Sequence, residues 1–419
     1  MLRTTRRLML AATIAVAFAV PQLGRAQCLG DGDLSDTVTV DEIVGVVNNA
    51  LNGCGGGPAT PQSVIENYAN ILYANYTDTA DAAQRLAVAI DELVAQPNQV
   101  TLDTAKAAWL AARPLYQQTE IGRFYDGPID NPDNSNPEGR INAWPLDESY
   151  IDYVTGNAAA GIINMPEAFP ILNAEVIRGL NEQGGESNIA SGWHAIEFLL
   201  WGQDLNVDGP GRRPYTDYVV GPGGTASNQQ RRGEYLKVIA AMLADDLRSV
   251  ANTWGPGGAN FRLQFLAQDP QVALSQIVTG IGTLSGFELS NERMAVALET
   301  QDQEDEHSCF SDNTHVDHRY DQIGIMNVYY GRYGTIDGPG LEDLVRAADA
   351  SLDQQIRTAF QTSLDAIYTI PIPFDQAVQG ADTAPGRQAI IHSVESLRAQ
   401  TRLIEDAAEE LGLDITTGS

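Results

Sequence analysis

The sequence is poor in basic residues, and this limits the partners that it can bind. It holds 25 lysines and arginines against 55 aspartates and glutamates, which gives a formal net charge of −30 at pH 7. Binding to a nucleic-acid backbone needs a basic face, so we do not expect nucleic acid as a partner. The surplus of carboxylates indicates a solvated acidic surface, and some of these groups could also hold cations.

Long apolar runs are absent beyond the first 26 residues. The start of the chain has three early arginines, an apolar stretch at residues 8–20 and a small residue, Ala26, near its end. This pattern predicts an export signal at residues 1–26. We therefore expect the mature chain in the periplasm or on the outer surface, without a transmembrane segment. Loss of the signal removes four arginines and brings the net charge to −34.

Cysteine is scarce as well, with only Cys28, Cys54 and Cys309. In an oxidising compartment Cys28 and Cys54 bracket one short segment and are natural disulfide partners, which leaves Cys309 over. The segment between them belongs to a predicted small module at residues 27–57 that ends in a glycine-rich linker.

Residues 31–42 in this module match a calcium-binding EF-hand loop. Such a loop places oxygen ligands at positions 1, 3, 5, 7, 9 and 12. The predicted calcium ligands are Asp31, Asp33, Ser35, Thr37, Thr39 and Glu42. Asp36 stands where the loop normally has the glycine of its sharp turn, which weakens the match. A polar turn without metal is the alternative.

Strand-like alternation is nearly absent after residue 60, and helical periodicity dominates. Val64, Tyr68, Ile71 and Leu72, for example, share one helix face. Loops rich in glycine, proline and asparagine separate such segments. The sequence therefore predicts an all-α protein with two helical bundles, at residues 60–222 and 223–419.

The most informative segment is SGWHAIEFLLWGQDL at residues 191–205. His194 and Glu197 are three residues apart, so a helix projects both from one face, where they can bind one metal ion. Their neighbours are apolar, and a buried charged pair is costly without a cation or another partner. The alternative is a buried histidine that is satisfied by a neighbouring carboxylate.

An earlier segment offers a third ligand. Trp109, Arg113, Tyr116 and Glu120 follow at spacings of four, three and four, which places them along one helix face. Glu120 can complete the metal site, and Arg113 can orient it by hydrogen bonds. An ordinary network between Arg113 and Glu120 within the helix is the alternative.

Several long segments resemble the imelysin-like family. GWHAIEFLLWGQD resembles its GxHxxE signature, and residues 108–130 are similar to its first-domain motif. QDQEDEHSCFSDNTHVD at residues 301–317 resembles the iron-regulated protein A subgroup. The resemblance implies two helical bundles with a shared cleft, placement in the periplasm or at the surface, and a role in iron acquisition.

The resemblance also implies a set of site residues. It places His194, Glu197 and Glu120 at the metal site, with Arg113 and Asp130 in support. Trp109, which shares the helix face of Arg113, is a further supporting candidate. In the second half of the chain it implies that Glu304, Asp305, His307 and Asp312 form or border the cleft.

Three functions remain open at this stage. A zinc peptidase of the HExxH type needs two helix histidines and a general-base glutamate, and no HExxH occurs here. Metal binding without turnover fits better, because one imidazole with several carboxylates suits iron, manganese or zinc. Iron rests on the resemblance, and a membrane permease or surface receptor is a candidate partner. The alternatives are an imelysin-type metallopeptidase and a surface adaptor that binds a protein.

Overall fold

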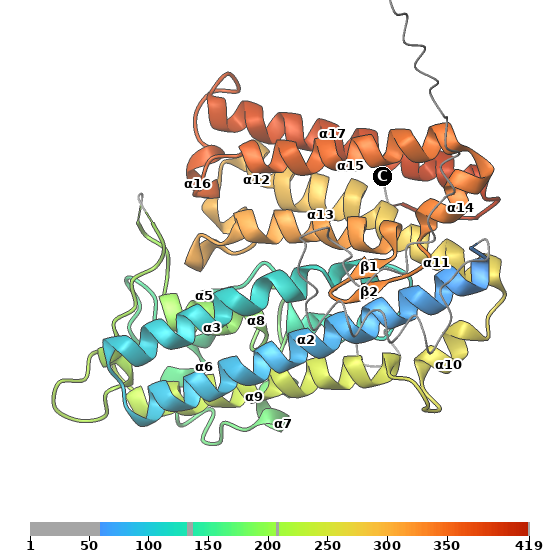
Figure 1. Ribbon diagram of the computed structural model, residues 1–419. Helices are drawn as coiled ribbons and strands as arrows, with labels where there is room; N and C mark the ends of the chain where they lie inside the picture. The colour runs from blue at the N-terminus through green and yellow to red at the C-terminus, as the bar shows by residue number, and fades with distance from the viewer. Residues whose placement is uncertain (1–58, 132–136, 207–208, 418–419) are drawn as a thin grey trace, which may run out of the picture. The chain divides into compact units, whose positions relative to one another are not determined.

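The computed structural model describes residues 59–131, 137–206 and 209–417. The predicted export signal, the Cys28–Cys54 disulfide and the calcium loop at residues 31–42 lie outside these residues. Within them nearly all regular secondary structure is helical, which confirms the predicted all-α class (Figure 1). The one sheet in the described part is a short antiparallel hairpin of β1 and β2.

The α-helices are α2 (Pro61–Ala95), α3 (Gln99–Gln117), α4 (Glu138–Ile141), α5 (Glu148–Ile151), α6 (Gly161–Asn164), α7 (Ala174–Leu180), α8 (Trp193–Trp201), α9 (Gln229–Trp254), α10 (Phe261–Leu266), α11 (Pro270–Thr283), α12 (Val296–Thr300), α13 (Thr314–Tyr330), α14 (Leu341–Ala348), α15 (Ala350–Thr369), α16 (Phe374–Ala377) and α17 (Pro385–Glu410). The 3₁₀ turns are η1 (Glu120–Gly122), η3 (Tyr215–Tyr218), η5 (Gln303–Asp305) and η6 (Cys309–Ser311), and η4 (Leu284–Ala295) is π-helical. The strands are β1 (Arg332–Tyr333) and β2 (Ile336–Asp337).

The first bundle is built on α2, α3 and α9. Thr60 and Ser63 form a capping box at the start of α2, and Pro61 occupies its first turn, so the local sequence fixes where the helix begins. Helices α3 and α9 both pack along α2. The boundary predicted between residues 222 and 223 places α9 in the second bundle, whereas α9 packs mainly on α2 of the first. Its apolar stripe predicts a helix but does not say which neighbour covers that stripe.

The second bundle contains α13, α15, α17 and a continuous helical run from Pro270 to Thr300 that joins α11, η4 and α12. By length and composition this run could cross a membrane, but 67% of its apolar window is buried inside the protein. Packing against α17 and α13 therefore accounts for its apolar character.

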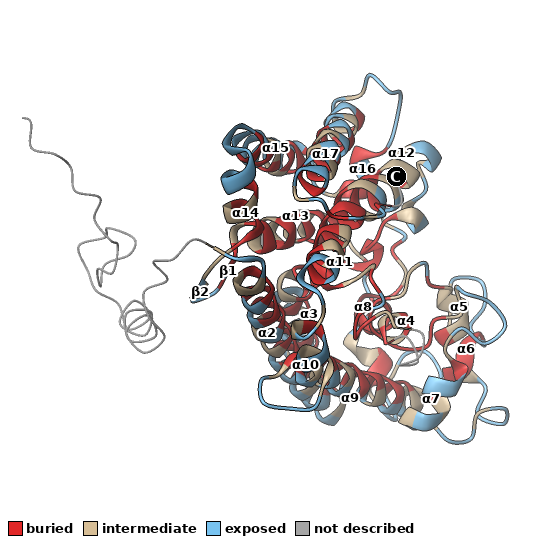
Figure 2. Cartoon of the chain, turned by 90° about the vertical axis from the view of Figure 1, so that its right-hand side faces the viewer, coloured by how far each residue is buried: buried red, intermediate tan, exposed pale blue. Residues whose placement is uncertain are grey.

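One large apolar core extends through both bundles, and a smaller one lies between η4, α15, α16 and α17. Figure 2 shows the buried residues on the faces that the helices turn toward one another. This shared core holds the two bundles together and fixes the short segments that lie between them.

Candidate metal site

Two glycines define the short helix α8, which carries the central motif. Gly192 has a φ of 94° and Gly202 a φ of 75°. A Cβ atom at Gly192 would lie 2.6 Å from the carbonyl oxygen of Ile141, so only glycine fits there. All nine residues from Trp193 to Trp201 are buried. The motif is therefore placed inside the protein, between the bundles.

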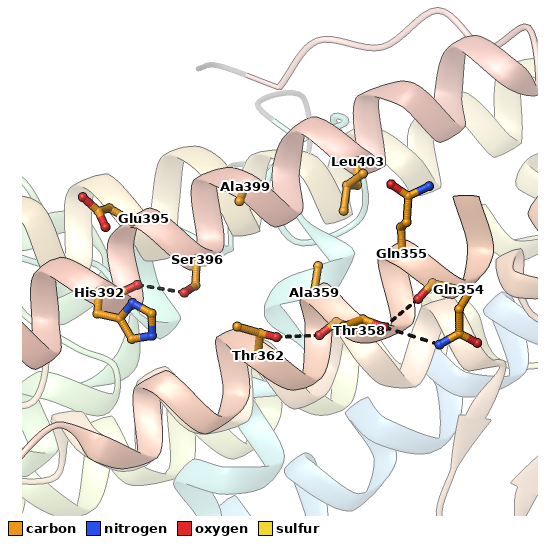
Figure 3. Close-up of a pocket in the computed structure, with 10 residues that line it drawn as sticks. All are labelled: Gln354, Gln355, Thr358, Ala359, Thr362, His392, Glu395, Ser396, Ala399 and Leu403. Atoms are coloured by element: carbon orange, nitrogen blue, oxygen red, sulfur yellow. Dashed lines mark hydrogen bonds between the residues drawn. The ribbon is translucent and has the colours of Figure 1, made fainter. Parts of the chain in front are cut away.

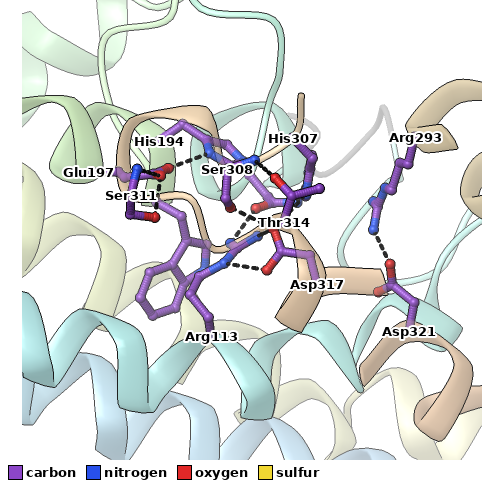
Figure 4. A network of polar contacts seen from close by, with 12 residues as sticks. Arg113, His194, Glu197, Arg293, His307, Ser308, Ser311, Thr314, Asp317 and Asp321 are labelled. Atoms are coloured by element: carbon purple, nitrogen blue, oxygen red, sulfur yellow. Dashed lines mark hydrogen bonds and ion pairs between the residues drawn. The ribbon is translucent and has the colours of Figure 1, made fainter. Parts of the chain in front are cut away.

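His194 and Glu197 face each other within this helix. The Nδ1 atom of His194 lies 3.0 Å from Oε2 of Glu197, and both side chains are fully buried (Figure 4). Oε1 of Glu197 accepts hydrogen bonds from the backbone N–H of Ser311 at 3.0 Å and from its hydroxyl at 2.6 Å. Both carboxylate oxygens are thus engaged, whereas Nε2 of His194 is buried without a hydrogen-bond partner.

A second imidazole lies beside the first and is held in the same way. The ring centroids of His194 and His307 are 4.8 Å apart. Nδ1 of His307 lies 2.8 Å from Oδ2 of Asp317, and its Nε2 has only a long contact of 3.5 Å to the amide nitrogen of Asn142. Each imidazole therefore directs Nδ1 at a carboxylate.

Arg113 holds this second pair in place from α3. It donates to both oxygens of Asp317, from Nε at 3.2 Å and from Nη2 at 2.9 Å, and Nη1 donates to Asn142 at 2.8 Å. The predicted supporting role of Arg113 thus has a geometric counterpart, although the carboxylate that it holds is Asp317. Trp109 fixes the start of α8, because its indole N–H donates to the carbonyl oxygen of Trp193 at 3.0 Å.

Burial and charge set the protonation of this network. Burial, together with the neighbouring His307 and Arg113, lowers the pKa of His194 well below its usual value. Burial also lowers the pKa of His307, to about 4. Although burial alone would raise it, Arg113 and His307 hold the pKa of Asp317 well below its ordinary value. Both imidazoles are therefore neutral at pH 7.

Burial raises the pKa of Glu197 to about 8, and the two donors of Ser311 offset this only in part. A cation next to His194 would favour the ionised carboxylate. In that form Nδ1 of His194 carries the proton, and Nε2 presents a lone pair.

Glu120 does not join this network. Helix α3 ends at Gln117, so Glu120 lies in the following turn η1 and leaves the face that Trp109, Arg113 and Tyr116 share. Oε2 of Glu120 accepts from Arg123 at 2.7 Å and from Arg293 at 2.5 Å. Against the effect of burial, these two arginines lower its pKa to about 2. Glu120 thus belongs to an ion-pair cluster.

Asp130 also lies apart from the two histidines. Its Oδ2 atom accepts a hydrogen bond from the backbone N–H of Phe124 at 2.5 Å. This bond closes the loop after η1, so its support for the site is indirect.

His307 lines a polar cleft of about 440 Å³ that has walls from both bundles, whereas His194 packs against the His307 ring and is not among the lining residues. His307, Asn142 and Trp144 line it on one side, and Arg293 and Glu288 of η4 line it on another. Asp305 lines it too, whereas Glu304 and Asp312 are not among its lining residues. A further hollow of about 500 Å³ lies between α15 and α17 (Figure 3), and it contains none of the predicted site residues.

The sequence did not identify four residues that shape the site: Asn142, Arg293, Ser311 and Asp317. Asp317 and Ser311 stand inside the quoted segment at residues 301–317, so that motif carried a signal for them. Arg293 carried none, because its position depends on the π-helical turns of η4.

The chain was also compared with known proteins. A family model described as Imelysin matches residues 72–404. Iron-regulated protein A from Synechococcus elongatus is 25% identical over 343 residues, which cover 78% of this chain and 82% of that protein.

Two solved structures share the fold. A putative iron-regulated protein A precursor from Parabacteroides distasonis has a TM-score of 0.63 and 18% identity, over 85% of this chain and 97% of that one. An imelysin-like protein from Psychrobacter arcticum has a TM-score of 0.59 and 14% identity, over 85% of this chain and 98% of that one.

Proposed function

Because the chain belongs to the imelysin family, we propose that it is an exported protein that binds a transition metal, with iron as its cargo, where His194 and His307 meet at the cleft. The names of the Synechococcus and Parabacteroides relatives support a role in iron handling. The predicted export signal supports placement in the periplasm or at the outer surface.

The observation that carries the proposal is the pairing of two imidazoles with two carboxylates. A metal-binding histidine usually donates its other ring N–H to a carboxylate, which fixes the ring and its tautomer. Glu197 and Asp317 lie 3.0 and 2.8 Å from Nδ1 of the two histidines, and with Glu197 ionised both accept in this way, so Nε2 of each histidine is the atom left for a ligand. An unsatisfied buried nitrogen such as that of His194 costs roughly 1–3 kcal/mol. A bound metal would remove this cost.

The roles divide differently from the sequence prediction. His194 and His307 would bind the metal, and Glu197 and Asp317 would orient them. Arg113 would hold Asp317, and Glu120 would stabilise the cleft wall through Arg123 and Arg293. Two imidazoles leave coordination positions for water or for a chelator that arrives with the iron. Imidazole ligands suit iron, and also manganese and zinc.

Metal loading tests this proposal. The full chain, freed of metal with a chelator, is loaded with ferrous iron without oxygen, and bound metal is measured by elemental analysis. We expect His194→Ala and His307→Ala to lose the bound iron. His392→Ala, which removes an exposed histidine on α17, is the control and should keep it.

Two carboxylate variants separate the new assignment of roles from the predicted one. Glu197→Gln should weaken binding by about 10–100-fold without abolishing it, as for other groups that orient a ligand. Glu120→Gln should keep the iron. Retention of the metal in both histidine variants would refute the site. Cleavage of an unfolded protein by the wild type but not by His194→Ala would favour the peptidase instead.

A further inference from the structure

Three carboxylates from separate segments meet away from the two histidines. Glu306 follows the turn η5, Asp312 follows η6, and Asp375 lies in α16. One oxygen from each lies within 4.8 Å of the others. We call these three residues the carboxylate triad.

The triad is buried, and most of its carboxylate oxygens lack hydrogen-bond donors, although Oδ2 of Asp375 accepts from the side-chain amide of Gln376 at 2.7 Å. Glu306 is only 1% exposed and Asp375 only 6%, while Asp312 is half-buried. Neither oxygen of Glu306 has a hydrogen-bond partner, and Oδ1 of Asp312 and Oδ1 of Asp375 have none either. The Thr314 hydroxyl is near enough to favour the charged form of Glu306, but it makes no hydrogen bond of normal geometry.

The surroundings add negative charge. Burial raises the pKa of Glu306 well above its usual value, and the charges of Asp375 and Asp312 raise it further. Burial raises the pKa of Asp312 to about 7, with the charges of Asp204 and Asp375 as further causes. In the described part of the chain, no lysine, arginine or histidine pairs with the three carboxylates.

An unpaired buried carboxylate is costly, and three that share one place also repel one another. A bound cation removes both costs. From this arrangement we propose that the carboxylate triad is a binding site for a hard divalent cation, with calcium as the ion that fits. The site shares no ligand with the two histidines, so it stands independently of the function proposed above.

The ligand chemistry selects calcium. All the available ligand atoms are carboxylate oxygens, which favour calcium, magnesium and manganese over softer metals. Oxygens up to 4.8 Å apart can share one calcium ion, whose bonds to oxygen measure 2.3–2.6 Å. Magnesium, with bonds of 2.0–2.1 Å, can bridge only oxygens that are at most about 4.2 Å apart, so calcium tolerates more of the range that the triad spans.

The position in the chain suggests what the ion does. Glu306 directly precedes His307, and Asp312 directly follows Ser311, the hydrogen-bond donor to Glu197. An ion at the triad would tie both ends of this segment to α16. It would thereby fix the loop that carries His307 into the cleft.

Calcium titration of the full chain tests the proposal. The protein is freed of metal with a chelator, and its melting temperature is followed as calcium is added up to millimolar concentration. We expect a rise of several degrees, because an ion that binds only the folded state stabilises it. Glu306→Gln and Asp375→Asn should each lose the rise, whereas Glu299→Gln, at an exposed position nearby, should keep it.

The predicted calcium loop near the N-terminus requires its own control. Asp31→Ala removes the first ligand of that loop and should leave the rise in place. A rise that disappears in Asp31→Ala but persists in Glu306→Gln would refute the triad, as would no rise in the wild type. His194→Ala should respond to calcium like the wild type, so this proposal and the iron proposal can fail separately.

Discussion

Two buried groups of carboxylates in this protein differ in what neutralises them. In the first, which we call the arginine–aspartate cluster, Asp152 and Asp217 lie against Arg213 and Arg232. Each oxygen of Asp152 accepts from Arg232, at 2.6 and 2.9 Å, and Asp217 accepts from Arg213, Tyr153 and Thr225. In the carboxylate triad, by contrast, four oxygens have no donor.

The buried carboxyl groups of the two clusters have pKa values that are shifted in opposite directions. Against the effect of burial, Arg213 and Arg232 lower the pKa of Asp152, whereas burial and like charges raise the pKa of Glu306. A buried carboxylate that is paired with arginines of the same chain is a structural part of the fold. One without them depends on something that the chain does not supply, and this difference separates structural clusters from candidate binding sites.

The histidine network is intermediate between these cases. Its charges are matched within the chain, because Arg113 neutralises Asp317. Nε2 of His194 is the ring nitrogen in this network that has no hydrogen-bond partner. The triad therefore needs a positive charge, whereas His194 needs only a partner for Nε2. This difference fits a permanent ion at the triad and a cargo metal at the histidines.

The largest effect should come from breaking the arginine–aspartate cluster. Asp152→Ala leaves Arg232 and Arg213 buried without their main partner, and we expect a loss of about 3–5 kcal/mol in the free energy of unfolding. Urea denaturation at pH 7 measures it. Asp91→Ala is the control, because its ion pair with Lys237 is exposed and should contribute at most about 1 kcal/mol. An equally small loss in Asp152→Ala would remove the contrast between the two clusters.

The next effect concerns Glu120, a third carboxylate with its own arginines, and it depends on pH. The folded state holds its pKa at about 2, below the unfolded value of 4.5. The ion pairs therefore stabilise the fold above pH 4.5, and this contribution is lost as the pH falls toward 2. The shift corresponds to about 3 kcal/mol. Glu120→Gln should be less stable than the wild type by this order at pH 7.

Denaturation curves at several pH values check the sign of this effect. The gap between wild type and Glu120→Gln should close as the pH falls from 4.5 toward 2. A gap that stays constant would mean that the two arginines do not depend on the ionised carboxylate.

The sequence predicted the helical fold because periodicity records which face of each helix is buried. It placed His194 and Glu197 together for the same reason, since a spacing of three lies within one helical turn. The prediction that Glu120 shares a helix face with Arg113 was wrong, because α3 stops at Gln117 and the next residues form a different turn. Periodicity cannot show where a helix stops when no strong terminating residue follows.

The sequence alone did not predict contacts between segments that are far apart in the chain. Nothing local pairs Arg113 with Asp317, or Glu306 with Asp375, because the packing of the second bundle brings these residues together. The partner of α9 was missed for the same reason. The resemblance to a family pointed to the segment at residues 301–317, but the structure was needed to divide it between the cleft and the triad.

The smallest effect is expected at the triad, and it is the most direct test of the comparison. Glu306 has no cation to lose, so in the presence of chelator Glu306→Gln should remain within roughly 1 kcal/mol of the wild type. Once calcium is added, Glu306→Gln should be less stable than the wild type, because only the wild type binds the ion. Urea denaturation with and without calcium measures both states. If Glu306→Gln costs as much as Asp152→Ala without calcium, the carboxylate is already compensated within the chain, and the triad belongs with the structural clusters.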